Sequence, residues 1–482
     1  MWKLLIFVSL PVLSSQSGQC YWNNQHPYPY YGSKTPYDSV RGDFRDVPEI
    51  KGNYKMQPDG PMTLKLLQNV AGYGRQRITY GGALLKSPRP ETFKPFLECE
   101  PVSIWFMVRH GTRRPNTNDS KTMRKASFLR ENIIQSHANG NVEMCAQDIE
   151  DLRNWNWNPK LDYKKSFLTS KGYQELFEFG HRFGQKYSSF LKEVHYSVIR
   201  PTSEQRTQGS VKAFLEGLQG INRSFVIENH IINDPVARPY RYCAKRGVQI
   251  INGTRLSFEI QRFQQTAEFK QVQENVQRRT GINIQLKPTS IMGMYDLCRF
   301  YRSYSALKRS PWCAVFSDHD LEILEYVEDL RHYFRNGFGD SLNPQTGAAG
   351  LKDLYEKFNA SKSGHKSFTA YFTHDTMVDM IYSAMGLYED YPKLSGFERI
   401  KDRKWRTSFL TPFAANFVAV LHRCPKIQNS TTNTYRIQFL VNEKEMHLCG
   451  DRFCSWKGFE NTFQKFTNTT LDFCDDFTYV YK

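Results

Sequence analysis

Three segments of this 482-residue chain share one pattern, in which a short apolar run stops at an arginine or a histidine and a turn or an amphipathic helix follows. The runs span residues 103–108, 196–199 and 368–373, and they contain the aromatic and β-branched residues that strands favour. Buried strands that alternate with helices are typical of α/β proteins with a parallel sheet. We therefore predict an α/β fold.

The residues that follow the three runs are charged or titratable. They are Arg109, His110 and Arg113 after the first run, Arg200 after the second, and His374 and Asp375 after the third. Open α/β sheets bind ligands at the carboxyl ends of their strands, beside helix N-termini. If the three strands are neighbours, these six side chains meet in one crevice.

This set of side chains has a chemical meaning. Three guanidiniums and one histidine can surround the oxygens of a phosphoryl group, a second histidine can attack phosphorus, and a carboxylic acid can protonate the leaving alcohol. No metal or other cofactor is required, because the arginines supply the positive charge. Taken alone, each junction also fits a surface turn, and RHGTRRP at 109–115 also fits a solvated loop. No phosphate loop of the form GxxxxGK[ST] is present, which argues against a nucleotide-driven kinase or ATPase.

RHGTRRP, together with the later His374-Asp375 pair, resembles the signature of the histidine phosphatase superfamily, in its acid phosphatase and phytase branch. The resemblance implies that His110 is a nucleophile that forms a phosphohistidine and that Asp375 is the proton donor. It also implies a phosphate clamp made of Arg109, Arg113, Arg200 and His374.

Within that branch the chain is most similar to the multiple inositol polyphosphate phosphatases. The similar segments include YGSKTPYDSV near the start, RPTSEQRTQGSVKAFLEGL in the middle and PFAANFVAVLHRC near the end. The resemblance implies a histidine phosphatase fold, with a mainly parallel sheet flanked by helices and an inserted, mostly helical cap. It also implies inositol phosphates as substrates, with 2,3-bisphosphoglycerate as another substrate type. One departure is His-Asp-Thr at 374–376, where this subfamily typically carries His-Ala-Glu. The shorter aspartate favours a different approach to the leaving oxygen.

The chain divides into a predicted signal peptide at 1–18 and one histidine phosphatase domain at 19–482. The leader has one early lysine and about ten apolar residues, too few to span a bilayer, and no other segment approaches the roughly 20 that a transmembrane helix needs. We expect the α/β core at about 60–115, 190–225 and 345–482. We expect the helical cap at about 116–190 and 226–344.

Ten cysteines, an even number spread from Cys20 to Cys474, indicate disulfides and an exported protein. Cys449 and Cys454 have the spacing of half a zinc site, but no second pair follows, so we predict a disulfide there. Six Asn-x-Ser/Thr sequons also favour a secreted glycoprotein; they are at Asn118, Asn222, Asn252, Asn359, Asn429 and Asn468. The ending TYVYK lacks a KDEL-like signal, so secretion is favoured over residence in the secretory-pathway lumen or the lysosome.

The formal charge of +17 predicts attraction to polyanions. The basic residues are spread along the chain without a nucleic-acid-binding module, so a nucleic-acid partner is not expected. The main hypothesis is a secreted phosphomonoesterase that hydrolyses inositol polyphosphates. The alternatives are a broad-specificity secreted acid phosphatase and a non-catalytic protein that binds polyanions. The oligomeric state cannot be inferred from these features.

Overall fold

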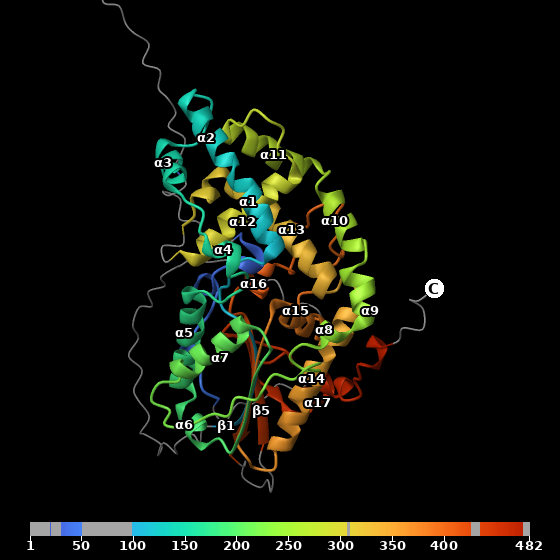
Figure 1. Cartoon of the computed structure of the whole chain (residues 1–482). Coiled ribbons are helices and arrows are strands. Elements are labelled where there is room, and N and C mark those ends of the chain that lie inside the picture. The colour runs from blue at the N-terminus through green and yellow to red at the C-terminus, as the bar shows by residue number, and fades with distance from the viewer. Residues whose placement is uncertain (1–19, 21–29, 51–98, 306–308, 426–433, 476–482) are drawn as a thin grey trace, which may run out of the picture.

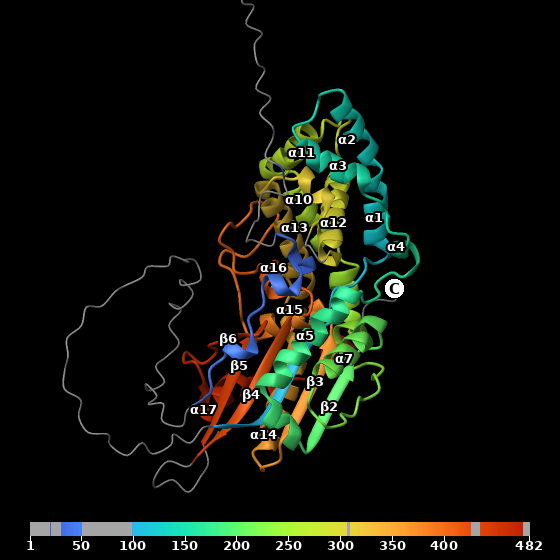
Figure 2. The same ribbon diagram turned by 90° about the vertical axis from the view of Figure 1, so that its left-hand side faces the viewer.

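The computed structural model describes residues 20, 30–50, 99–305, 309–425 and 434–475. A helical layer lies above a sheet whose faces carry further helices (Figures 1 and 2). The predicted signal peptide, the predicted core residues 60–98 and the sequon at Asn429 lie outside the described residues.

Within the described residues the sheet has seven strands in the order β2-β3-β1-β4-β5-β6, with β7 also paired to β5. The strands are β1 (Glu100–Arg109), β2 (Tyr196–Pro201), β3 (Ser367–Thr373), β4 (Asn416–Cys424), β5 (Thr434–Val441), β6 (Lys444–Met446) and β7 (Cys454–Ser455). The three predicted runs are therefore strands β1, β2 and β3, and they are adjacent. This part of the prediction is confirmed.

Among the strands that the structure describes, only these three are parallel to one another. In the register of β1 and β3, Arg109 lies opposite Thr373, so both strands end at the same level. The pairs β1–β4, β4–β5, β5–β6 and β5–β7 are antiparallel. The α/β fold is confirmed, but its sheet is mixed rather than mainly parallel, because the C-terminal strands are joined by short connections that only antiparallel neighbours allow.

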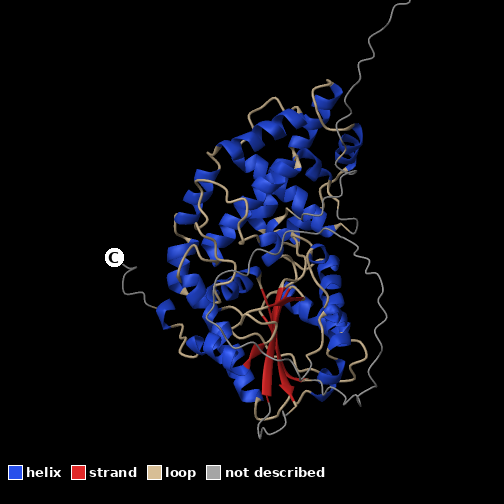
Figure 3. Cartoon of the chain, turned by 180° about the vertical axis from the view of Figure 1, so that it is seen from behind, coloured by secondary structure: helices blue, strands red, loops and turns tan. Residues whose placement is uncertain are grey.

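Helices cover both faces of the sheet (Figure 3). One face packs against α5 (Ser170–Lys186), α6 (Ser188–Glu193) and α7 (Gln205–Gly217), with a core of phenylalanines around Phe106. The other face packs against α14 (Leu342–Ser361), α15 (Asp375–Ala384) and α17 (Trp456–Phe463). The side chains of β1 alternate between these two cores, as the two-residue period of a strand requires.

The helical layer consists of elements from two separate stretches of the chain. They are α1 (Thr117–Ser127), α2 (Leu129–Ala138), α3 (Ala146–Asn154), α4 (Lys160–Tyr163), α10 (Arg255–Phe263), α11 (Ala267–Thr280), α12 (Pro288–Tyr304) and α13 (Asp318–Asn336). The predicted cap segment of about 116–190 includes α5, but α5 packs on the sheet, and so does the following α6. Gly180 and Gly217 allow α5 and α7 to approach so closely that a Cβ at either glycine would lie within 2.2 Å of a backbone oxygen of the other helix.

Short elements complete the chain between these layers. They are the 3₁₀ turns at Gly32–Lys34, Tyr37–Ser39, Phe44–Asp46, Pro311–Val315, Gln464–Phe466 and Asp472–Cys474, the helices α8 (Pro239–Tyr242), α9 (Ala244–Arg246) and α16 (Thr407–Leu410), and the π-helical turn η5 (Gly247–Ile251). No helix among the described residues is long and apolar enough to cross a membrane.

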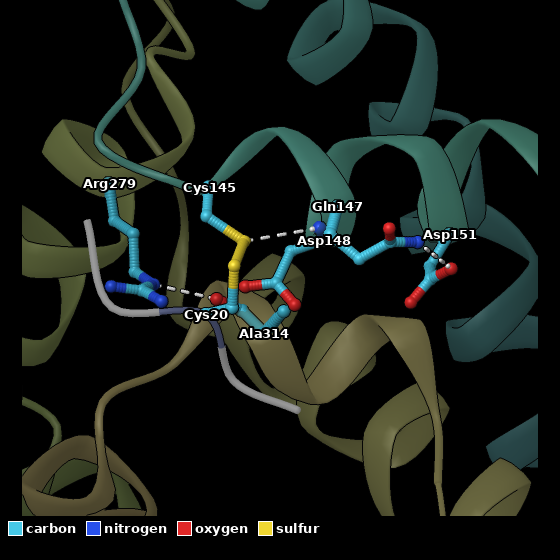
Figure 4. The surroundings of a disulfide bond; sticks show 7 residues. All are labelled: Cys20, Cys145, Gln147, Asp148, Asp151, Arg279 and Ala314. Carbon is cyan, nitrogen blue, oxygen red and sulfur yellow. Dashed lines mark hydrogen bonds between the residues drawn. A yellow bond between two sulfur atoms is a disulfide. The ribbon is translucent and has the colours of Figure 1, made fainter. Parts of the chain in front are cut away.

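All ten cysteines form disulfides. The pairs are Cys20–Cys145, Cys99–Cys424, Cys243–Cys474, Cys298–Cys313 and Cys449–Cys454. The disulfide predicted for Cys449 and Cys454 is confirmed. Asp148 lies beside the first pair, within 4.8 Å of both sulfurs (Figure 4). Because those sulfurs are bonded to each other, neither is available as the thiolate that metal binding requires.

Candidate active site

A pocket of about 510 Å³ lies where the parallel strands β1 and β3 end. Its lining consists of His110, Arg113, Arg206, Arg238, Tyr240, Arg241, Cys243, Arg246, Gly247, Ile251, Asn252, Arg335, His374, Asp375 and Thr376. Six of these residues are arginines, and Asp375 is the only carboxylate among them. Helices α7 and α15 begin beside the pocket, and their N-termini add partial positive charge.

His110 follows β1 and is buried. Its ring Nδ1 lies 2.8 Å from the Gly111 carbonyl oxygen, which can only accept a hydrogen bond, so Nδ1 carries the proton. Burial lowers the pKa of His110 well below its ordinary value, and the positive charges of Arg206 and Arg109 lower it further. The imidazole is therefore neutral, with the Nε2 lone pair free.

Glu175 on α5 holds the turn after His110 through hydrogen bonds. The Glu175 carboxylate accepts the Thr112 backbone N–H at 2.7 Å and the Thr112 hydroxyl at 3.0 Å. Burial raises the pKa of Glu175 to about 7, although the bonds from Thr112 oppose this shift. Gly111 is needed here because a Cβ would lie 2.1 Å from the Gly172 carbonyl oxygen. These contacts hold Arg113 at the edge of the pocket.

Arg109 is fully buried behind the pocket. Its Nη1 donates to the backbone oxygens of Ser33 at 2.5 Å and Thr411 at 2.7 Å, and its Nη2 lies 2.9 Å from Oδ2 of Asp375. Burial alone would raise the pKa of Asp375, but Arg109, with His332 and Lys34, outweighs burial and holds that pKa well below its usual range. The Asp375 carboxylate is therefore ionised.

His374 follows the last residue of β3, and its ring contacts an arginine. Nη2 of Arg206 lies 3.2 Å from Nδ1 of His374, and Nε2 of His374 lies 3.2 Å from a carboxylate oxygen of Glu204. Since a guanidinium only donates hydrogen bonds, Nδ1 accepts and Nε2 carries the proton. Burial lowers the pKa of His374 to about 4, so this ring is neutral as well. Its plane makes an edge contact with the His110 ring, with the centroids 5.4 Å apart.

The structure does not bring Arg200 together with the other predicted site residues. Strand β2 continues to Pro201, so Arg200 lies inside the strand, opposite Tyr371 and over its ring. The Arg200 side chain pairs with Glu228 at 2.8 Å and with Asp234 at 3.5 Å, and it does not line the pocket. The pocket instead contains Arg206, from the first turn of α7. Its Nε has no hydrogen-bond partner among the described residues.

A second group of pocket residues was missed. Arg238, Arg241 and Arg246 come from the short segment that contains α8 and α9, and Arg335 comes from α13. Four basic residues within 238–246 were a visible signal in the sequence, but their orientation depends on the Cys243–Cys474 disulfide and on the packing of α9, which spacing alone does not reveal.

Residues 103–442 match the histidine phosphatase superfamily, branch 2. The chain belongs to this superfamily. The multiple inositol polyphosphate phosphatase 1 of Drosophila melanogaster is 28% identical over 371 residues, which cover 74% of this chain and 78% of that protein. Phytase A of Aspergillus awamori is 24% identical over 393 residues, which cover 73% and 78%. The family match and these relatives show that the chain is a phosphatase.

Solved structures show the same fold. The phytase from D. castellii superposes with a TM-score of 0.63 at 16% identity, covering 78% of this histidine phosphatase and 82% of that chain. The multiple inositol polyphosphate phosphatase of Bifidobacterium longum, in its complex with inositol hexasulfate, superposes with a TM-score of 0.58 at 13% identity, covering 87% and 92%. The histidine phosphatase fold expected from the sequence is confirmed.

Proposed function

We propose that this phosphatase hydrolyses inositol polyphosphates through a phosphohistidine on His110. Nε2 of His110 forms a bond to phosphorus while the bond from phosphorus to the inositol oxygen breaks, and Asp375 protonates that oxygen. Water then attacks phosphorus and gives a proton to the Asp375 carboxylate, the bond to Nε2 breaks, and inorganic phosphate leaves. The neutral His110 ring, with its proton on Nδ1, supports this role because Nε2 presents a lone pair.

Arginines would hold the transferred phosphoryl group during both steps. Arg113 and Arg206 line the pocket beside His110, and Arg109 lies directly behind it. Guanidinium groups match phosphate oxygens in charge and in geometry. His374 is proposed to orient Arg206 through Nδ1, as well as to border the phosphate.

Asp375 must acquire a proton before it can act as an acid. Its pKa is low because its carboxylate pairs with Arg109. A phosphate dianion next to Arg109 adds like charge near the carboxylate, and like charge raises a carboxyl pKa. Substrate binding would thus favour the protonated form of Asp375 that the first step requires.

The charge of the pocket carries the substrate proposal. Six arginines face one carboxylate, and only some of these cations fit around a single phosphoryl group. Burial lowers the pKa of Arg206 and of Arg246 to about 10, with repulsion from Arg113 and Arg335, respectively, as the next cause. Several anionic groups on one ligand would relieve this repulsion. The relatives named as inositol polyphosphate phosphatases and phytases support the same substrate class.

Export is the setting proposed for this activity. All ten cysteines are paired, and disulfides of this number persist in oxidising compartments. Secretion then agrees with the leader predicted at the start of the chain.

The decisive experiment compares kcat/KM for inositol hexakisphosphate and for 4-nitrophenyl phosphate. A polyphosphate-specific pocket gives a much higher value for the first, and Arg335→Ala and Arg241→Ala lower that value while leaving the second nearly unchanged. Equal values for both substrates in the wild type would instead favour the broad acid phosphatase, an alternative suggested by the His374-Asp375 form.

The mechanism is tested separately with His110→Ala. This variant is expected to release no phosphate from either substrate and to form no acid-labile phosphohistidine after rapid quenching. Wild-type activity is expected to survive a chelator, since the guanidiniums supply the positive charge. Normal turnover by the variant would reject His110 as the nucleophile.

A further inference from the structure

One sequon lies at the mouth of the pocket. Asn252 is exposed and lines the pocket, whereas Gly253 and Thr254 of the same sequon line a neighbouring cavity of about 420 Å³. The triplet Asn252-Gly253-Thr254 therefore forms the ridge between two hollows of the surface. We propose that Asn252 carries an N-linked glycan and that this glycan restricts access to the pocket by substrate size. The second half of this proposal rests on the proposed function.

The local backbone presents the Asn252 side chain to a modifying enzyme. The Asn252 N–H donates to the Gly247 carbonyl at 2.9 Å and closes the π-helical turn η5, and α10 starts three residues later at Arg255. The sequon thus occupies a turn between two helices. Within the described chain, the Asn252 amide is not hydrogen bonded, so both of its N–H groups are available.

Gly253 keeps this turn tight. A Cβ at this position would lie 2.0 Å from the Gln249 carbonyl oxygen, so the backbone folds back on η5 and Asn252 lies at the outside of the bend. Surface turns of this kind are where glycosylation acceptors are found in exported proteins.

The other described sequons have no such position. Asn118 lies on α1, Asn359 on α14, and Asn222 and Asn468 lie on connections, and all four are exposed. None of the four lines the pocket or the neighbouring cavity. A glycan at Asn252 is therefore the one, among the described sequons, that would meet an approaching substrate.

The modification is a glycosyl transfer from a lipid-linked oligosaccharide pyrophosphate. A bond forms between Nδ2 of Asn252 and C1 of the first sugar, the bond from C1 to the pyrophosphate oxygen breaks, and Nδ2 loses one proton. The lipid pyrophosphate is the leaving group. The sugar then stands beside the exposed Arg241, so it narrows the entrance without neutralising the arginines that line the pocket.

The first test measures occupancy. The full chain, with its own leader, is expressed in eukaryotic cells and collected from the medium, and the peptide that contains Asn252 is analysed by mass spectrometry before and after enzymatic glycan release. We expect glycan on that peptide in the wild type and its complete loss in Asn252→Gln. An unmodified Asn252 in the exported protein, whatever the other sequons carry, overturns the proposal.

The second test measures access. Asn252→Gln is expected to raise kcat/KM for inositol hexakisphosphate by about threefold relative to the wild type, and to leave kcat/KM for 4-nitrophenyl phosphate unchanged. Asn222→Gln is the matched control, because it removes an exposed loop sequon away from the pocket, and it should change neither value. An unchanged ratio in Asn252→Gln overturns the access role. If the wild type hydrolyses only 4-nitrophenyl phosphate, the proposed substrate class is wrong. The glycosylation of Asn252 is still decided by the mass-spectrometric measurement of occupancy.

Discussion

The guanidinium of Arg109 and the carboxylate of Asp375 form an ion pair, with 2.9 Å between Nη2 and Oδ2. The pair joins the end of β1 to the first residue of α15, two positions 266 residues apart in the chain. The pair holds Asp375, the proposed acid, against Arg109, and Arg109 also lies behind the proposed phosphoryl site. The state of the acid is thereby coupled to the anion that the pocket binds.

This coupling predicts a dependence on the leaving group for Asp375→Asn. The amide keeps a hydrogen bond to Arg109 but cannot release a proton, so turnover of inositol hexakisphosphate should fall by about 10²–10³-fold. Nitrophenolate leaves without protonation, so 4-nitrophenyl phosphate should lose far less activity. The kcat of wild type and variant on both esters checks this. Equal losses on the two substrates would contradict a role as proton donor.

A second prediction distinguishes the role of Arg206, which lines the pocket, from that of Arg200 on β2. Arg206→Ala should lower kcat/KM by about 10- to 100-fold, because it removes a charge-assisted donor from the pocket. Arg200→Ala should leave kcat/KM within about twofold and lower the melting temperature, because Glu228 and Asp234 lose their partner. Steady-state kinetics and thermal unfolding of both variants measure these effects. A larger kinetic loss in Arg200→Ala would reverse the assignment.

The sequence predicted Arg200 for the site, whereas Arg206 lines the pocket, and this difference shows how far local pattern can locate a site residue. The three apolar runs were long and β-prone enough to reveal the strands, and two of the strand ends carry the expected residues. At β2 the strand continues for one residue past Arg200, and the side chain of a residue within a strand points to a face of the sheet rather than beyond its end. The arginine that reaches the pocket is therefore the one on the following helix turn. Such a shift of a few residues cannot be resolved from local pattern alone.

The arginines of 238–246 show a different limit. Their charges were visible in the sequence, but a disulfide to Cys474 and the contacts of Arg246 with α13 and α14 determine where they point. These partners lie between about 90 and 230 residues away, so the geometry is a tertiary property. Likewise, α5 could be recognised as a helix but not assigned to the sheet side, since that depends on the close contact at Gly180 and Gly217.

A third prediction concerns stability and pH at His422, on β4 and outside the pocket. Burial, with Lys186 nearby, lowers the pKa of this histidine to about 3, while in the unfolded chain it is about 6.5. Between these values the unfolded state binds the proton and the folded state does not, so stability falls as the pH falls from about 6.5 towards 3.

His422→Gln removes this proton-binding group and should flatten that decline. The slope of the unfolding free energy against pH should decrease by up to about 1.4 kcal/mol per pH unit, because one full proton is removed from the difference. Denaturant unfolding of both proteins at pH 4 to 7 measures it. Other titrating groups, such as Glu175, are present in both proteins and cancel in the comparison. Parallel curves would show that the pKa of His422 is the same in the folded and unfolded states. The kcat/KM of the variant is expected to be unchanged.

The last prediction addresses the bond that anchors the arginine-bearing side of the pocket. Cys243 lies between Arg241 and Arg246 and is bonded to Cys474, next to the C-terminal turns that pack on α14. Arg246 is also held by the Arg335 carbonyl at 2.6 Å, whereas no hydrogen bond or ion pair holds the Arg241 side chain within the described residues. The disulfide is therefore a covalent restraint on the segment that carries Arg241 and Arg246.

The double variant Cys243→Ser/Cys474→Ser should lower kcat/KM for inositol hexakisphosphate about 10-fold through a higher KM, because displaced cations no longer meet the outer phosphates. Activity on 4-nitrophenyl phosphate should persist, since His110 and Arg113 are held by the sheet and by Glu175. The matched control is Cys99→Ser/Cys424→Ser, which also opens a loop of several hundred residues but joins the opposite end of β1 to β4. Both variants should lose stability, so the kinetics are measured well below their melting temperatures. A similar KM increase in the control would mean that the effect comes from general loosening of the fold, whereas an increase confined to the first variant identifies the Cys243–Cys474 bond as the element that positions these arginines.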